Sequence, residues 1–229
     1  MGSYYHFITD PLPQKKCSLE DSICLTKHAQ GLVHTFVLGA PEHGIKKLDR
    51  LHMDDLSVKT PDLFYELWNI RIGGFNNTII DDLSIYMPFK IIRANFHTTL
   101  MVDSDYKLDG LMFGMPVTGE GKCAILLKNV QMEMIFIFDI IKNEHGKDVF
   151  DIKKYFYGAD AIDGTYNYLG NLYNGDKKKS DAFHKVMNTS WRALVANYGR
   201  YFTAKISDDI FEAFKKLMCS RPIEEYAEY

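Results

Sequence analysis

The residues that could do chemistry are scattered along this chain. The sequence has no Gly-x-Ser-x-Gly elbow, no His-Glu-x-x-His pair and no phosphate-binding or dinucleotide-binding glycine loop. His28 and His34 share a predicted helix at i, i+6, a poor spacing for one metal ion. The acidic pairs Asp54-Asp55, Asp81-Asp82 and Asp208-Asp209 are sequence neighbours, whose side chains point apart on a strand or helix. We therefore predict no catalytic residue, no metal site and no cofactor.

The four cysteines allow a second kind of chemistry, disulfide formation. Cys17 and Cys24 are close enough for a short disulfide to be feasible, and loop entropy gives such a ring a stabilising effect of roughly 2.5 kcal/mol. Cys123 lies in a strand pattern and Cys219 at the end of a helical pattern, and we expect both to be buried thiols. The spacing of the four suits neither zinc nor a redox pair.

Composition excludes several classes of protein. The chain has 229 residues, of which 46% are hydrophobic and 25% charged, with a net charge of −3. We predict one domain over residues 1–229, with a flexible N-terminus over residues 1–16. The run Lys177-Lys178-Lys179 is typical of a solvated helix approach, so we predict no nucleic-acid binding. No stretch approaches the ~20 apolar residues of a membrane span, and we predict no stable membrane insertion.

The start of the chain has no signal peptide pattern. Met1-Gly2-Ser3 is typical of a start codon with a cloning remnant ahead of a mature secreted N-terminus. In a secreted chain the sequon at Asn76 would be a glycosylation site, and the sequon at Asn188 is the less credible one because it falls on a predicted helix.

The elements that must position any site are a long helix and a series of strands. Apolar residues recur at helical spacing from Ser180 to Met218 without a proline, which predicts one amphipathic helix of about 58 Å. A coiled coil would need strict heptads, which are absent. A shorter helix is predicted over Glu20 to Leu38, ending at Gly39-Ala40-Pro41.

Between these helices the hydrophobic period changes to two. Alternation is clear over 83–89, 96–102 and 132–140, and turn residues separate the runs, which predicts consecutive antiparallel strands. The predicted fold class is therefore α+β, with a highly curved antiparallel sheet wrapped around the long C-terminal helix.

Such a wrap can leave an apolar tunnel along the helix, although aromatic and Met residues more often form core. The chain carries 10 Met and 15 Phe, which adapt to irregular apolar shapes. Candidate polar groups for a ligand's head are Asn95, Thr98, Thr99, Tyr155, Tyr157, Tyr166 and Tyr168. The phase of the strand over 132–140 stays open, because Ile135 and Ile137 occupy its other face. The predicted ligand-binding residues are Phe96, Thr98, Leu100, Met132, Met134, Phe136, Phe138, Trp191, Val195, Tyr198 and Phe202.

Several short motifs resemble the insect takeout and juvenile hormone-binding protein family. They are Cys17…Cys24-Leu25, Gly44-Ile45-Lys46-Lys47-Leu48, Asp54-Asp55-Leu56, Trp68-Asn69-Ile70…Gly74, Gly119-Glu120-Gly121-Lys122 and Leu127-Lys128-Asn129-Val130. The strongest is Leu172-Tyr173-Asn174-Gly175-Asp176 followed by Asn188 and Trp191. The resemblance implies a secreted α/β-wrap protein with an elongated apolar cavity and a Cys17–Cys24 disulfide. It is closer to the takeout branch, because the long helix holds no cysteine before Cys219.

The predicted function is a secreted carrier of an elongated hydrophobic small molecule, such as a terpenoid, a quinone, a fatty acyl lipid or a juvenile hormone-like compound, and we expect a monomer. The alternative is a secreted structural or interaction protein of the same fold with a filled interior. A third class is a hydrolase or isomerase acting on a lipid in the tunnel. A continuous cavity of hundreds of Å³ would favour the carrier, and side chains meeting across the interior would favour the alternative.

Overall fold

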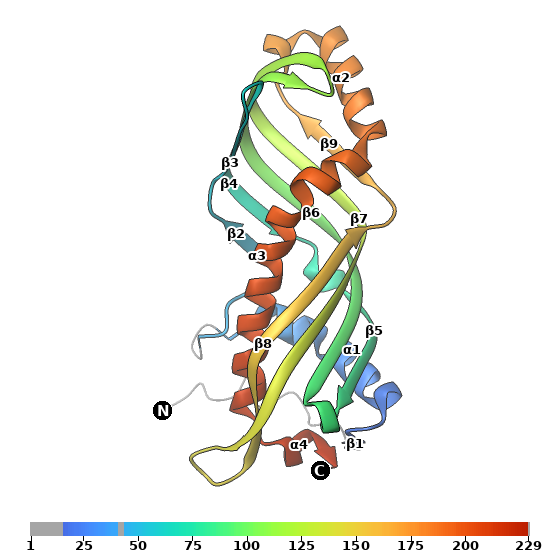
Figure 1. The fold of residues 1–229 in the computed structure, drawn as a ribbon, viewed down its shortest axis with the longest axis vertical. Helices are drawn as coiled ribbons and strands as arrows, with labels where there is room; N and C mark the ends of the chain where they lie inside the picture. The colour runs from blue at the N-terminus through green and yellow to red at the C-terminus, as the bar shows by residue number, and fades with distance from the viewer. Residues whose placement is uncertain (1–15, 41–43, 229) are drawn as a thin grey trace.

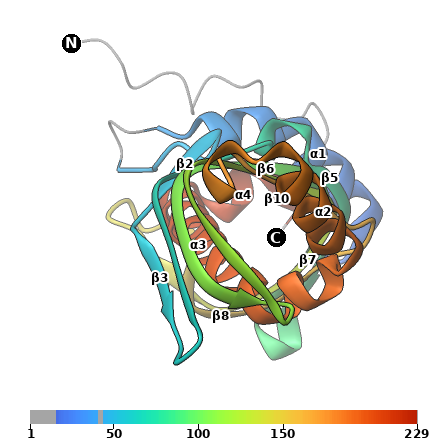
Figure 2. The ribbon, with the colours of Figure 1, turned by 90° about the horizontal axis from the view of Figure 1, so that it is seen from above.

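A strongly curled antiparallel sheet, with one long helix running along it, makes up most of the molecule (Figure 1). The computed structural model describes residues 16–40 and 44–228. The predicted flexible N-terminus therefore lies outside the described residues except for Lys16. Viewed down the long axis, the strands curl into an arc, with α3 lying along it (Figure 2).

Within the described residues, eight strands form the main sheet, in the order β2-β4-β6-β7-β8, with β3 on β4, β5 on β6 and β9 on β7. All of these pairings are antiparallel, as the alternation of apolar residues predicts. The strands are β2 (Arg50–Met53), β3 (Leu56–Lys59), β4 (Leu63–Gly73), β5 (Ile79–Tyr86), β6 (Ile91–Met112), β7 (Met115–Lys142), β8 (Asp148–Ala161) and β9 (Thr165–Leu169).

The hairpin of β6 and β7 forms the centre of the sheet, and β4, β5, β8 and β9 pair with it. Its strands have 22 and 28 residues and stay paired from Ile91 with Ile137 to Met112 with Met115. Phe113 and Gly114 close the hairpin with φ of 54° and 72°, the two positive values that a type I′ turn requires. Alternate residues of both strands are buried, so one face of the hairpin supplies most of the interior.

The helices are α1 (Ser22–Leu38), α2 (Lys177–Thr189), α3 (Trp191–Ser220) and α4 (Ile223–Tyr226), with short 3-10 turns η2 (Phe75–Asn77), η3 (Met87–Phe89) and η4 (Tyr173–Gly175). The prediction of α1 is confirmed, and Asp21 caps it by accepting from the Cys24 N–H. The predicted Pro41 stop lies outside the described residues, but the helix does end before Gly39, at φ 64°.

The prediction of one unbroken helix over Ser180 to Met218 is wrong at Ser190, which separates α2 from α3. The hydroxyl of Thr189 donates to the carbonyls of Lys185 and Val186, and this kind of side-chain bond to the preceding turn bends helices. The break lets α2 pack across the end of the sheet near β9, while α3 follows the length of the sheet (Figure 1). No helix of the described residues is long and apolar enough to cross a membrane.

Side chains of α1 satisfy the free edge of β5. The Gln30 amide donates to the Thr78 carbonyl and accepts from the Ile80 N–H, and Thr26 Oγ1 accepts from the Leu83 N–H at 2.8 Å. An open edge would otherwise present unpaired backbone groups.

The two ends of the described chain meet in a small parallel sheet. Strand β1 (Cys17–Ser18) pairs with β10 (Ala227–Glu228), with Cys17 opposite Ala227. The disulfide between Cys17 and Cys24 then links this sheet to the first turn of α1.

The interior is packed solid at the end of the molecule near α4, which we call the α4 end. There the ring of Phe136 in β7 meets Phe214 of α3 at 4.4 Å between centroids, and Phe138 meets Phe150 of β8 at 4.7 Å. Burying such rings is among the largest favourable terms available to a core of this size.

Candidate ligand-binding site

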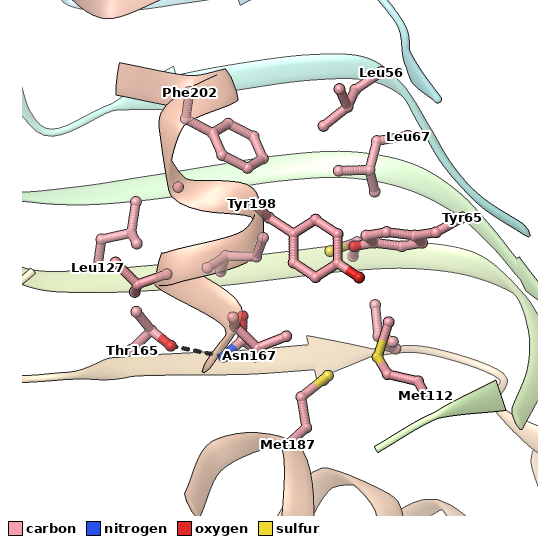
Figure 3. A pocket seen from close by; sticks show the side chains of 16 residues that line it. Leu56, Tyr65, Leu67, Met112, Leu127, Thr165, Asn167, Met187, Tyr198 and Phe202 are labelled. Atoms are coloured by element: carbon pink, nitrogen blue, oxygen red, sulfur yellow. Dashed lines mark hydrogen bonds between the residues drawn. The ribbon is translucent and has the colours of Figure 1, made fainter. Parts of the chain in front are cut away.

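A cavity of about 60 Å³ lies at the opposite end, which we call the α2 end, between α3, α2 and the concave face of the sheet (Figure 3). Its sixteen lining residues are Leu56, Tyr65, Leu67, Met112, Cys123, Ile125, Leu127, Thr165, Asn167, Leu169, Met187, Leu194, Val195, Tyr198, Gly199 and Phe202.

The spacing of these residues explains why they meet. Tyr65 and Leu67 are two apart in β4, and Cys123, Ile125 and Leu127 alternate along β7. Thr165, Asn167 and Leu169 do the same in β9, so each strand turns one face inward. The α3 residues from Leu194 to Phe202 recur at i, i+4 and i, i+5, which places them on the side of the helix facing the sheet.

The lining carries no charged side chain among the described residues. Its amide, on Asn167, is already engaged: Nδ2 donates to Thr165 Oγ1 at 2.8 Å and to Asn188 Oδ1 at 3.2 Å. Asn188 of α2 completes the pair, since its Oδ1 accepts from the Asn167 N–H and its Nδ2 donates to the Asn167 carbonyl. These hydrogen bonds hold α2 against β9. Because they occupy the Asn167 amide, the cavity wall that remains for a ligand is mostly apolar.

Three ionisable groups, Tyr65, Cys123 and Tyr198, lie in the wall, and burial raises the pKa of each. Burial, and next the neighbouring Cys123, raise the pKa of Tyr65 well above its usual value. Burial likewise raises the pKa of the Cys123 thiol to about 11, against the opposing effect of the Ser104 and Tyr65 hydroxyls. The site is therefore uncharged near neutral pH and suited to an apolar ligand rather than to nucleophilic catalysis.

Three of the predicted ligand-binding residues, Val195, Tyr198 and Phe202, line this cavity. Phe96 and Met132 instead border a second hollow of about 660 Å³, whose wall is mainly polar and includes Asp81, His97 and Glu133. A wall of that kind is unsuited to an apolar chain.

The remaining predicted strand residues lie in the packed core. Leu100, Met134, Phe136 and Phe138 are each at most 2% exposed and line neither hollow, and the Thr98 hydroxyl donates to the Gly74 carbonyl. The phase of the strand over 132–140, which the sequence left open, is the one that buries Met132, Met134, Phe136 and Phe138, with Ile135 and Ile137 on the less buried face.

Trp191 is partly buried but lies outside the cavity. Its ring covers Gly164, where an added Cβ would lie 3.4 Å from it, and the Arg192 guanidinium sits 4.1 Å above the ring centroid. The break at Ser190 makes Trp191 the first residue of α3, at the junction with α2 and not along the inner stripe.

Sequence reasoning missed the cavity residues of β4, β7 and β9, above all Tyr65, Cys123 and Asn167. On β9 it chose Tyr166 and Tyr168 as head-group candidates, yet these are 56% and 50% exposed on the outer face. The alternation Thr165, Asn167, Leu169 was the available signal, because it places the less aromatic face inward.

The Cys17–Cys24 disulfide is present, with Cα atoms 5.6 Å apart, and His28 Nδ1 lies 3.0 Å from the Cys17 sulfur. Cys123 is a free buried thiol as expected, but the expected burial of Cys219 is wrong, since that cysteine is exposed. Of the two sequons, Asn76 is exposed on η2, whereas the Asn188 side chain is engaged with Asn167.

Comparisons with known proteins give one consistent result. The family described as haemolymph juvenile hormone binding protein (JHBP) matches residues 4–228. A circadian clock-controlled protein, daywake of Drosophila melanogaster, is 25% identical over 238 residues, covering 95% of this chain and 88% of the relative, and its Drosophila yakuba counterpart is 24% identical. The crystal structure of Takeout 1 from Epiphyas postvittana superposes with a TM-score of 0.86 at 30% identity, covering 93% of this chain and 99% of that one.

The Takeout 1 match confirms the predicted wrap of a curled antiparallel sheet along a long C-terminal helix. The chain therefore belongs to the juvenile hormone-binding protein family, in its takeout branch.

Proposed function

We propose that this protein is a secreted carrier of an elongated, uncharged, hydrophobic small molecule, held at the α2 end between α3 and the concave face of the sheet. The observation that carries the proposal is the cavity wall itself, which has no charged side chain among the described residues and is built mostly of aliphatic, Met and aromatic groups. Each CH₂ that a ligand buries there contributes about 0.8 kcal/mol. A buried carboxylate or ammonium would find no partner.

A long ligand requires the wall to adapt. The cavity measures about 60 Å³, whereas pockets for drug-sized ligands measure roughly 300–1,000 Å³. Met112 of the β6–β7 hairpin and Met187 of α2 line it on the same side (Figure 3), and unbranched thioether chains change rotamer at low cost. We propose that these two side chains move aside when the ligand enters.

Secretion is part of the same proposal. The Cys17–Cys24 disulfide is typical of an oxidising compartment, and the exposed Asn76 in its Asn76-Asn77-Thr78 sequon is the proposed glycosylation site. Protein secreted from insect cells should shift in mass on endoglycosidase treatment, and Asn76→Gln should abolish that shift. A persistent shift in the variant would contradict the assignment.

The binding test uses protein purified from a secretory host. Organic extraction and mass spectrometry identify any bound lipid, and displacement of a fluorescent lipid probe measures binding of terpenoids, quinones and fatty acyl esters. Val195→Phe fills the cavity and should abolish displacement, while Ala196→Phe, one residue away on the exposed side of α3, should leave it intact. No extracted lipid and no binding at about 100 μM would reject the carrier.

The second candidate is a structural or interaction protein of the same fold. It is favoured by the solid packing of the α4 end and by the small volume of the cavity. In that case Val195→Phe and Ala196→Phe would behave alike in the binding test. Chemical conversion of a bound lipid during incubation would instead support a hydrolase or isomerase.

A further inference from the structure

The Cys17–Cys24 disulfide has a histidine beside it. Cys24 and His28 are four residues apart on α1, so their side chains share one face of the helix, and β1 brings Cys17 to the same place. The His28 Nδ1 lies 3.0 Å from the Cys17 sulfur, and the Nε2 lies 3.9 Å from it. One nitrogen of His28 and the two sulfurs all lie within 4.8 Å of one another. The imidazole therefore faces the disulfide at hydrogen-bonding distance.

The two sulfurs of this disulfide differ in access. Cys17 is 1% exposed, whereas Cys24 is partly exposed at the start of α1. Thiol–disulfide exchange begins when an external thiolate attacks one sulfur, and access helps to decide which one. An incoming thiolate therefore reaches Cys24, and Cys17 is the sulfur that leaves.

His28 contacts the sulfur that leaves. As the disulfide opens, the electron pair of the S–S bond stays on Cys17 and negative charge develops there. A neutral disulfide sulfur is a weak acceptor and a thiolate is a strong one, so a hydrogen bond from the His28 N–H strengthens as the bond breaks. A stabilised thiolate is a better leaving group. Without a donor, a thiolate at this buried position would be costly.

We infer that Cys24 is a site of reversible covalent modification by small thiols such as glutathione, in which Cys17 is the leaving sulfur and His28 stabilises its thiolate. Glutathione, after losing its thiol proton to solvent, attacks the Cys24 sulfur and forms a mixed disulfide with it. The Cys17–Cys24 bond breaks with its electron pair on Cys17, and the Cys17 thiolate takes up a proton from solvent. One disulfide replaces another, so the exchange needs no further oxidant or reductant.

The same contacts serve the reverse reaction. When the Cys17 thiolate attacks the mixed disulfide at Cys24, glutathione leaves and the ring closes again. Cys17 is paired with Ala227 in the β1–β10 sheet, so opening the disulfide does not release its backbone. Cys24 stays one helical turn from His28 on α1. Both sulfurs thus remain in place for the bond to form again in the folded protein.

The first test maps the site of modification. Protein carrying Cys219→Ser, which removes the exposed free thiol, is incubated briefly with reduced glutathione. Free thiols are then trapped with N-ethylmaleimide in denaturant, and the digest is analysed by mass spectrometry. We expect glutathione on Cys24 and the maleimide on Cys17. Glutathione mainly on Cys17, or no adduct on Cys24 after an exposure that modifies the denatured protein, would overturn the inference.

A second measurement isolates the role of His28 through the rate of adduct formation in the same background. His28→Phe removes the N–H and keeps a ring, His28→Asn places an amide donor close to the Nδ1 position, and His34→Phe changes an exposed histidine of the same helix. We expect His28→Phe to slow the reaction about three- to tenfold and His34→Phe less than about twofold, since only part of the thiolate charge has developed when the S–S bond breaks.

The asparagine variant separates hydrogen bonding from packing. His28→Asn should recover part of the rate that His28→Phe loses, because its amide N–H can donate to the Cys17 thiolate. Equal losses in His28→Phe and His28→Asn would show an effect of packing alone and contradict the assignment of His28. An unchanged rate in His28→Phe would contradict it as well.

Discussion

The α4 end and the α2 end are built from the same strands and the same helix, yet one is solid and the other hollow. At the α4 end, α3 turns large rings toward the sheet, with Phe214 on Phe136 and Phe211 on Tyr155 at 4.7 Å. At the α2 end the same helix presents Val195 and Gly199 beside Leu194, Tyr198 and Phe202. The small residues Val195 and Gly199 contribute to the space that remains between this part of α3 and the sheet.

We expect the two ends to have different roles, one in stability and the other in ligand binding. The α4 end also contains the disulfide, the terminal β1–β10 sheet and α4, so we expect most of the resistance to unfolding to reside there. The α2 end has fewer close ring contacts and is where we propose that the ligand enters. The predictions below test this division, from the largest expected effect to the smallest.

Phenylalanine truncation should separate the two ends most strongly. Phe136→Ala should lower the free energy of unfolding by about 3–5 kcal/mol, because the ring is 2% exposed and closely packed. Phe202→Ala should cost less, because Phe202 already borders the cavity and one side of its ring has no packing partner to lose. Urea unfolding measures the free energy of unfolding of both variants. Equal losses in Phe136→Ala and Phe202→Ala would contradict the difference in packing between the two ends.

The disulfide should be the next largest contribution. Cys24→Ser should lower the free energy of unfolding by roughly 2.5 kcal/mol, since it opens the ring closed by two cysteines seven positions apart at the start of α1. Thiol titration of denatured, unreduced wild type should find two reactive groups, Cys123 and Cys219. Four reactive groups would show that the bond does not form. Ligand affinity should be nearly unchanged, because the bond is remote from the cavity.

Gly199→Ala should move stability and binding in opposite directions. Alanine in a helix interior is about 1 kcal/mol more favourable than glycine, and the added Cβ would lie 3.4 Å from Val195 Cγ1. The same change at Gly31 of α1, where nothing lies within 4 Å, should give a similar gain in stability. Only Gly199→Ala should weaken ligand binding. If both variants lose affinity for the ligand, the effect does not come from the cavity beside α3.

Acid should loosen the α2 end slightly. His184 of α2 is stacked on Tyr168, and its Nε2 accepts from the Leu169 N–H, which requires a neutral ring. Burial lowers the pKa of His184, so the unfolded chain takes up the proton first. The stabilisation is therefore present above pH ~6.5 and is lost as the pH falls below it.

The measurement for this prediction is the urea midpoint at pH 7.5 and 5.5. The difference between the two pH values should shrink in His184→Gln and persist in His145→Gln, which changes an exposed histidine paired with Glu144. An unchanged difference in His184→Gln would remove His184 as the cause.

The strands and the burial of their inner faces could be predicted from the sequence, because period-two alternation directly encodes which side chains share a face. Met132, Met134, Phe136 and Phe138 are buried as that pattern requires. Alternation does not say what fills the opposite side, so nothing in those residues predicted that Phe214 would close the space. The cavity needs Val195, Gly199 and Tyr65 to face one another from distant segments, which only the assembled sheet specifies.

The break at Ser190 was equally hidden. Neither proline nor glycine marks it, and the local feature beside it is the Thr189 hydroxyl, whose proton is shared between the carbonyls of Lys185 and Val186. Without it Trp191 would have continued the apolar stripe of α2, which is why the tryptophan was predicted to line the tunnel.

The pairing of Cys17 with Ala227 has a consequence for the order of events during synthesis. At roughly 5–20 residues per second, the ribosome delivers Ala227 some 10–40 s after Cys17 has been made. Cys17 and Cys24 can join during that interval, while the strand that will hold Cys17 has no neighbour. The small parallel sheet can thus form only after the disulfide has had time to close.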